Sequence, residues 1–191
     1  MPTSRRYHHG DLRRAVLDAA VTVITESGPS GVSLRDLARR AGVSHAGPIH
    51  HFGDKAGVLT ALAAEGYTLL ADAVIDAQQR TGQLVEMGVA YIRFAVEHRA
   101  HFEVMFRPDL YHADDPAVAS ARQRASEALV SGAGSVTDRQ PGSDTDLLAV
   151  AAWSLVHGFA TLWLTGALQT ELGPDLDAAA RAVAETLVGS G

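Results

Sequence analysis

Residues 33 to 55 of the chain read SLRDLARRAGVSHAGPIHHFGDK, and this stretch predicts two short helices joined by a tight turn. Ser33 is a good N-cap for the first helix, because its hydroxyl can accept a hydrogen bond from an N–H group of the first turn. Gly42 follows the last apolar position of that helix, where a left-handed residue ends a helix at little cost. Ser44 is the expected N-cap of the second helix, which should end near Phe52. Such a pair forms a helix-turn-helix, whose second helix is suited to the major groove of DNA.

The same stretch resembles the head of the tetracycline-repressor (TetR) family of bacterial transcription regulators. The resemblance rests on Ala41-Gly42-Val43-Ser44, then His51-Phe52 and Lys55, and the spacing matches without a gap over residues 11 to 70. One position departs from the family pattern. Five residues after the Ser the family usually has Tyr, whose hydroxyl contacts a phosphate, and this chain has Ile49. Since Ile cannot hydrogen-bond, the departure bears on affinity or site preference and not on the fold.

The charge of the chain is divided unevenly along its length. Residues 1 to 60 hold eight Lys or Arg against five Asp or Glu, a net charge of +3, together with five His. Residues 61 to 191 hold eight Lys or Arg against seventeen Asp or Glu, a net charge of −9. Phosphate would repel the acidic part and attract the basic part. The asymmetry therefore favours a DNA-facing end and a separate second function.

Side chains of several kinds could contact DNA in the basic part. Arg5 and Arg6 lie on an N-terminal arm that either touches the DNA or is a solvated tail. Ala46 and Gly47 are small enough for the backbone to approach base edges and a thymine methyl. Lys55, the only lysine, lies near a helix N-terminus that suits a phosphate, or is a plain surface residue. The candidate DNA contacts are Arg5, Arg6, Ser33, Arg35, Ser44, His45, Ala46, Gly47, His50, His51 and Lys55.

Helical periodicity without strand patterns predicts an all-α fold of about nine helices. We expect residues 1–54 to form a three-helix DNA-binding domain with its arm, and residues 55–191 to form a helical bundle for ligand binding and dimerisation. Expected helices cover about 11–26, 34–41, 45–51, 55–77, an apolar line from 84 to 106, 116–129, 144–168 and 175–187, with a loop over 132–143. The helix from residue 144 should be buried on more than one face. Two late helices this apolar predict a homodimer through a four-helix arrangement.

A second resemblance lies in the bundle. Trp153 followed by His157-Gly158 resembles a C-terminal domain type found in one branch of the TetR family, and it implies a small-molecule pocket. Pockets between helices are mostly apolar with few polar groups. The candidate ligand contacts are Tyr91, His98, Phe102, Met105, Phe106, Trp153 and His157, although each of them can equally be a core residue.

Several function classes are excluded or disfavoured by what the sequence lacks. The absence of Cys excludes disulfides, thiolate metal sites and Cys nucleophiles. We find no Gly-rich phosphate loop, no paired His with metal spacing and no nucleophile elbow, so we expect neither an enzyme nor a cofactor or metal site. The apolar stretch 147–168 is interrupted by polar residues and reads as a buried helix, not a membrane span. With no signal peptide in view, the cytoplasm is expected.

The favoured hypothesis is a dimeric repressor that a small, mostly apolar effector releases from double-stranded operator DNA. The alternative is a small-molecule-binding helical dimer with a weakened DNA-binding head, which the Gly47-Pro48-Ile49 segment motivates. A helical enzyme is a distant third hypothesis.

Overall fold

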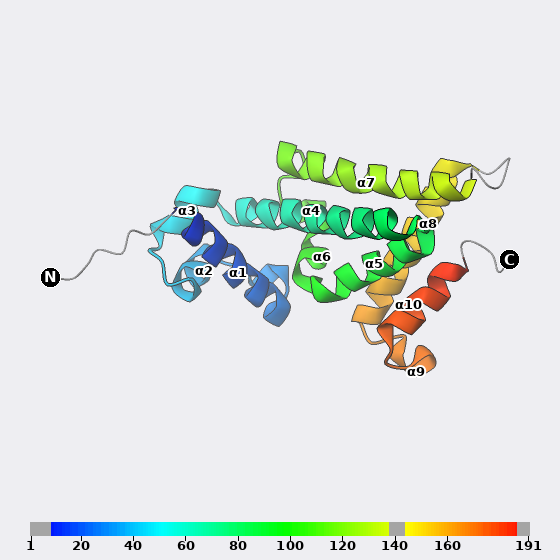
Figure 1. Ribbon diagram of the computed structural model, residues 1–191. Helices are drawn as coiled ribbons and strands as arrows, with labels where there is room; N and C mark the ends of the chain where they lie inside the picture. The colour runs from blue at the N-terminus through cyan, green and yellow to red at the C-terminus, as the bar shows by residue number, and fades with distance from the viewer. Residues whose placement is uncertain (1–8, 138–143, 187–191) are drawn as a thin grey trace. The chain divides into compact units, whose positions relative to one another are not determined.

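A computed structural model describes residues 9–137 and 144–186 of the chain, with side chains from residue 12 to 136 and from 144 onward. Within these ranges the fold consists of ten α-helices and two short 3-10 helices, without strands (Figure 1). The described residues form two compact units. The first unit contains the residues up to 65 and residues 100–119, and the second unit contains residues 66–99 and the residues from 120 onward. The prediction of an all-α fold is confirmed.

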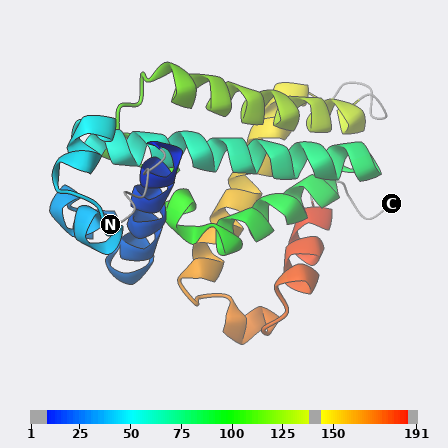
Figure 2. The ribbon, with the colours of Figure 1, turned by 60° about the vertical axis from the view of Figure 1, so that its left-hand side comes forward.

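Helices α1 (His9–Ser27), α2 (Leu34–Arg40) and α3 (Ala46–Phe52) form the three-helix head in the first unit, with the short helix η1 (Pro29–Gly31) after α1 (Figure 2). Ser33 caps α2 as predicted, because its hydroxyl accepts a hydrogen bond of 3.2 Å from the N–H of Asp36. Gly42 has a φ of 66°, which is the expected left-handed stop. The core of the head is formed by side chains with almost no exposed surface, among them Val16, Leu17, Ile24 and Leu37.

The first unit also contains the start of α4 (Lys55–Thr81), most of α6 (Arg99–Met105) and η2 (Pro108–Leu110). Asp54 caps α4, since its carboxylate accepts a hydrogen bond of 2.8 Å from the N–H of Gly57. The loop after η2 is fixed to α4 by the N–H of His112, which donates to the hydroxyl of Thr60 at 3.0 Å. The segment after α6 therefore belongs to the same compact unit as the helix-turn-helix.

The second unit is built around α5 (Leu84–Glu97), which packs against α8 (Thr145–Leu164) and α10 (Leu176–Glu185). Helix α7 (Pro116–Thr137) and the short α9 (Gln169–Leu172) complete the described helices. Two ion pairs join α5 to α10. Arg93 binds both carboxylate oxygens of Asp177 at 2.6 Å, and Arg181 binds Glu86.

Four local predictions are corrected by the structure. The apolar line from 84 to 106 is two helices, because His98 leaves the helical conformation between α5 and α6. Ser44 does not cap α3, since His45 holds the N-cap position without a side-chain cap bond. The loop predicted to begin at Gly132 is helical up to residue 137, and the rest of it, 138–143, lies outside the described residues. Gly132 is a packing residue, because a Cβ there would lie 2.5 Å from the sulfur of Met87.

The fourth correction concerns α8, which is not buried on several faces. Its neighbours α5 and α10 cover one side, which holds Ala152, Val156, Phe159 and Ala160. The apolar side chains that remain exposed on it are Leu147 (67%), Val150 (56%), Trp153 (41%) and Leu162 (49%). By length and composition alone both α4 and α8 could cross a membrane, with 56% and 33% of their most apolar windows buried. Core helices of soluble proteins pass the same test, so this is weak evidence for a membrane span.

Candidate DNA-binding face and effector site

Helix α3 presents two different faces. Gly47 and Pro48 are buried on the inner face, and a Cβ on Gly47 would lie 3.1 Å from the side chain of Leu12 in α1. This position therefore accepts only a glycine without a shift of Leu12. Gly47 was a candidate DNA contact in the sequence, and its role is to let α3 approach α1. The exposed residues of this segment are Ser44, His45, Ala46, Ile49 and His50.

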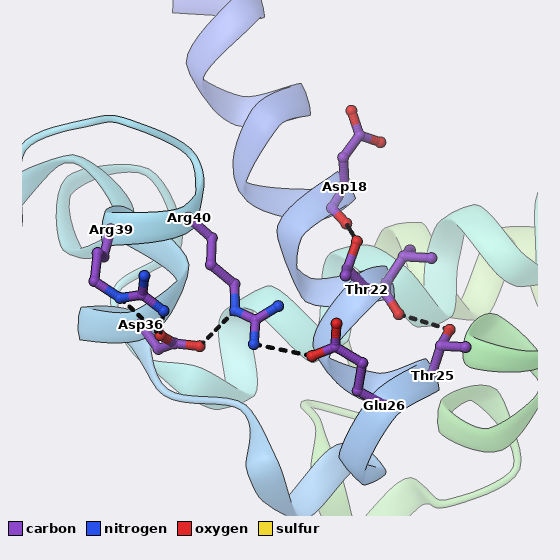
Figure 3. A network of polar contacts seen from close by, with 8 residues as sticks. Asp18, Thr22, Thr25, Glu26, Asp36, Arg39 and Arg40 are labelled. Atoms are coloured by element: carbon purple, nitrogen blue, oxygen red, sulfur yellow. Dashed lines mark hydrogen bonds and ion pairs between the residues drawn. The ribbon is translucent and has the colours of Figure 1, made fainter.

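A network of charged side chains supports α2 from the side of α1 (Figure 3). Arg40 donates from Nε to Asp36 at 2.8 Å and contacts Glu26 of α1 at 2.9 Å. Arg39 binds the other oxygen of Asp36 at 2.6 Å. Together Arg39 and Arg40 hold the pKa of Asp36 below its ordinary value. Because Asp36 stays ionised and engages both arginines, these two cations serve the head's own structure.

Arg35 differs from its two neighbours on α2. It is exposed, and within the described part of the chain it forms no ion pair. Lys55 is half-buried, and its Nζ donates a hydrogen bond of 3.0 Å to the carbonyl of Ser30. The lysine thus holds η1 against the start of α4. Of the three arginines on α2, Arg35 is the one whose charge is not paired with a carboxylate among the described residues.

Another head candidate, His51, lies at the end of α3. The ring of His51 is half-buried between the rings of His50 and Phe52, with centroids 5.6 Å and 6.5 Å away. Phe52 is half-buried as well, and the guanidinium of Arg13 lies 5.7 Å from its ring centroid. This packing favours a structural role for His51 at the helix end, and a phosphate contact of His51 stays a prediction. Arg5 and Arg6 lie outside the described residues.

In the second unit three candidate ligand contacts lie together. The hydroxyl of Tyr91 on α5 is 2.9 Å from Nδ1 of His157 on α8, and Nε1 of Trp153 donates to the same hydroxyl at 3.4 Å. Tyr91 is buried, His157 is half-buried and Trp153 is 41% exposed. Exposure to solvent therefore decreases across the three side chains, from Trp153 through His157 to the buried Tyr91.

The three side chains of this triad are linked through the Tyr91 hydroxyl. The indole of Trp153 can only donate, so the oxygen of Tyr91 accepts that bond. Between the Tyr91 hydroxyl and Nδ1 of His157 either group can donate, depending on the tautomer of the imidazole. Burial lowers the pKa of His157 and raises that of the Tyr91 phenol, and both shifts favour the neutral forms. The triad is thus an uncharged hydrogen-bonding group in apolar surroundings, the kind of polar element that orients a ligand.

The other four candidate ligand contacts are dispersed. His98 is half-buried beside Phe94, with ring centroids 5.3 Å apart, in the second unit. Phe102 and Met105 are buried in the first unit, where the ring of Phe102 lies 5.2 Å from that of Phe106. A ligand role for these four residues stays a prediction.

Comparison with known families identifies both parts of the chain. Residues 16–62 match the model described as "Bacterial regulatory proteins, tetR family". Residues 84–187, more than half of the chain, match the model described as "Tetracyclin repressor-like, C-terminal domain". The chain belongs to the TetR family. The resemblance of the helix-turn-helix to the TetR head is thereby confirmed.

The chain is also similar to individual proteins and to a solved structure. A solved structure from Rhodococcus sp. RHA1, described as a protein with unknown function, is 32% identical with a TM-score of 0.79 and covers 97% of each chain. The uncharacterized HTH-type transcriptional regulator YobS of Bacillus subtilis (strain 168) is 28% identical over 97 residues, which are 49% of this chain and 51% of that protein. The HTH-type transcriptional repressor Rv3405c of Mycobacterium tuberculosis (strain ATCC 25618 / H37Rv) is 40% identical over 55 residues, 29% of this chain and 27% of that protein. The chain thus spans about half, or less, of the length of these curated relatives.

One group of polar residues was missed by the sequence reasoning. Arg14 of α1 binds Glu65 of α4 at 2.8 Å, and the buried His101 of α6 has its Nε2 3.5 Å from the same carboxylate. His101 is only 5% exposed. The three residues lie far apart in the sequence and belong to no short motif. A polar residue at an apolar position of the helical pattern was the one available signal, and only His101 provides it.

Proposed function

We propose that this TetR-family chain is a DNA-binding transcriptional regulator, a repressor that leaves its operator when a small, mostly apolar effector binds. Residues 1–54 carry the DNA-binding function and residues 55–191 carry effector binding and dimerisation. The repressor role takes support from the relative named as a transcriptional repressor, which shares the head region. The working compartment is the cytoplasm, and catalysis plays no part in the function.

The observation that supports DNA binding most directly is the two-faced α3. Its inner face holds the buried Gly47 and Pro48, with Gly47 close to Leu12 of α1, and its outer face is exposed and free of acidic side chains. Helix α2 adds Arg35 and the serine cap at Ser33. In a helix-turn-helix the second helix enters the major groove and the first crosses the phosphate backbone. The DNA contacts we propose are Ser33, Arg35, Ser44, His45, Ala46, His50 and Lys55, with Arg5 and Arg6 from the arm.

A homodimer is proposed from the exposed side of α8. Four large apolar side chains at helical spacing remain uncovered there, which is unusual for a monomer. A second copy could cover them by packing α8 and α10 against their own counterparts as a four-helix arrangement. A symmetric dimer would present two copies of α3 to half-sites about 34–36 Å apart.

The effector site we propose centres on Tyr91, Trp153 and His157. These residues offer a neutral hydrogen-bonding group beside apolar surfaces, which suits a small molecule with one or two polar atoms. The spacing of Trp153 and His157-Gly158 supports placing the chain in the family branch with this C-terminal domain type. An effector would act through its different affinities for the DNA-competent and DNA-incompetent states, so a few kcal/mol of difference is needed for release.

Titration of the full-length protein against the DNA upstream of its own gene tests the proposal. We expect a specific complex whose affinity falls steeply between about 50 and 200 mM salt, because several phosphates are neutralised. A scrambled duplex of the same length and composition is the control. Absence of any shift at low salt would refute the regulator and favour the alternative, a helical dimer with a weakened DNA-binding head. Ile49 in place of the usual Tyr is the observation that keeps this alternative in view.

A further inference from the structure

Ile49 is placed where a hydrophobic side chain has no covering partner. It is 55% exposed, and among the described residues of the first unit it is the only large hydrophobic side chain that is exposed. The other exposed large hydrophobics belong to the second unit, on α7, α8 and α9. The exposure of Ile49 therefore does not belong to the apolar surface that we assign to the dimer.

The neighbours of Ile49 on the same side of the helix are known from the exposure pattern. His45 and Ala46 are exposed and lie four and three residues before Ile49, so they neighbour it on one helix face, and the exposed His50 follows about 100° around the helix at the edge of that face. This face, defined as the outer face of α3, has an apolar centre of Ala46 and Ile49 with an imidazole at each end. It carries no carboxylate and no permanent positive charge.

An apolar centre restricts what the outer face can contact in a major groove. Most of the groove edge consists of hydrogen-bond donors and acceptors, which lose water without compensation against an Ile side chain. The single apolar group on that edge is the C5-methyl of thymine. An Ile in the groove is therefore favoured beside thymine and disfavoured beside the exposed polar edge of the other bases.

We propose that Ile49, with Ala46 beside it, recognises the C5-methyl groups of thymines in each operator half-site. The inference rests on the proposed DNA-binding function and names the base that the head prefers at this contact. The position that usually provides a phosphate contact in the family provides base discrimination in this chain. His45 and His50 flank the methyl contact and can hydrogen-bond to adjacent base edges.

The test begins with selection of bound duplexes from a random pool by the full-length protein. In the selected half-site each thymine is then replaced, one at a time, by deoxyuridine, which removes only the methyl group. We expect a loss of about fourfold in affinity at one or two thymines per half-site, which corresponds to about 0.8 kcal/mol for one buried methyl-sized group. The remaining thymines should tolerate uracil and serve as internal controls.

Variants assign the methyl contact to Ile49. Ile49→Val keeps a branched apolar side chain and should retain uracil sensitivity at the same positions. Ile49→Ser should bind thymine and uracil duplexes equally, and since the side chain is exposed the head should remain folded, as circular dichroism can check. Uracil sensitivity that persists in Ile49→Ser, or is absent in the parent protein, overturns the proposal and leaves the regulator intact. Failure of the parent protein to select any DNA would overturn both the thymine contact and the proposed DNA-binding function. The exposed Ile49 would then be a candidate contact for a protein partner.

Discussion

Arg14 in α1 and Glu65 in α4 form an ion pair of 2.8 Å across 51 residues of sequence. The same Arg14 also binds Asp18 on its own helix, and the buried His101 of α6 lies 3.5 Å from Glu65. One carboxylate therefore meets side chains from two other helices of the first unit. A rearrangement of α6 or α4 in this unit would disturb a direct contact of the DNA-binding head.

We predict that Glu65→Gln lowers the free energy of unfolding by about 1 kcal/mol. The Glu65 side chain is mostly shielded from water, which places the expected loss near the upper end of the range for surface ion pairs. Arg14 is half-exposed, so solvent screening keeps the loss from exceeding that range. Urea unfolding followed by circular dichroism measures the change. Asp18→Asn, which removes the exposed partner of Arg14, is the matched control and should change stability by less. Equal losses in both variants would show that the ion pair between α1 and α4 contributes no more to the free energy of unfolding than the pair within α1.

Restoring the usual family residue should strengthen DNA binding. In Ile49→Tyr the regained phenol can hydrogen-bond to a phosphate, and on operator duplexes with deoxyuridine at the sensitive positions, where the Ile49 methyl contact is already absent, we expect a gain of about 1 kcal/mol in binding free energy. Fluorescence anisotropy with a labelled operator duplex measures it. Ile49→Phe adds the ring without the hydroxyl and separates the hydrogen bond from simple ring contact. If Tyr and Phe bind alike, the phosphate contact is not regained.

Arg35 should contribute mainly electrostatic affinity. It is exposed on α2, whereas Arg39 and Arg40 are engaged by Asp36. Arg35→Gln is expected to weaken binding to all duplexes alike and to reduce the slope of log affinity against log salt by about 1. Arg122→Gln on α7, also exposed, removes the same charge far along the chain and should leave the slope unchanged. A sequence-dependent loss in Arg35→Gln would instead indicate a base contact.

The exposed side of α8 gives a prediction about assembly. Leu147→Glu combined with Val150→Glu places two charges at positions that are 67% and 56% exposed, so the subunit should still fold. We expect the mass in solution, measured by multi-angle light scattering, to fall from that of a dimer to that of one chain. Ser126→Glu on the exposed side of α7 is the control. A parent protein that is already a single chain would contradict the proposed dimer.

His157 should make stability depend on pH. Burial holds the pKa of His157 below its ordinary value of 6.5, so the unfolded chain binds this proton more readily than the folded chain. Its contribution is fully present above about pH 6.5 and is lost as the pH falls through the lowered value. His157→Gln removes this titration, and the difference in unfolding free energy between parent and variant should shrink on acidification. A difference that stays constant between pH 7.5 and 5 would show that His157 is not shielded in solution.

Much of the fold could be predicted because the relevant signals are local. Ser33, Asp54, Asp144 and Asp175 cap their helices through backbone N–H groups three residues away, and a short window of sequence contains both partners. The stop at Gly42 is equally local. The same reasoning failed at Gly132, where a glycine that suggested a loop lies inside a helix and packs against the side chain of Met87 on another helix.

The candidate sites were predictable by residue type and not by arrangement. The sequence suggested Tyr91, Trp153 and His157, and the structure joins them by hydrogen bonds across more than 60 positions. It also separates Phe102, Met105 and Phe106 into the first unit. No periodicity could have distinguished these outcomes, because helical spacing describes one element at a time.

The sequence by itself determined most of the helices, the cap at Ser33, the basic head and the departure at Ile49, since propensity, capping and charge depend on neighbouring residues. Only the tertiary structure decided that Gly47 faces inward and Ile49 outward, and that Arg14, Glu65 and His101 meet. Those relationships depend on how helices pack, and packing is set by contacts between residues that are distant in the chain.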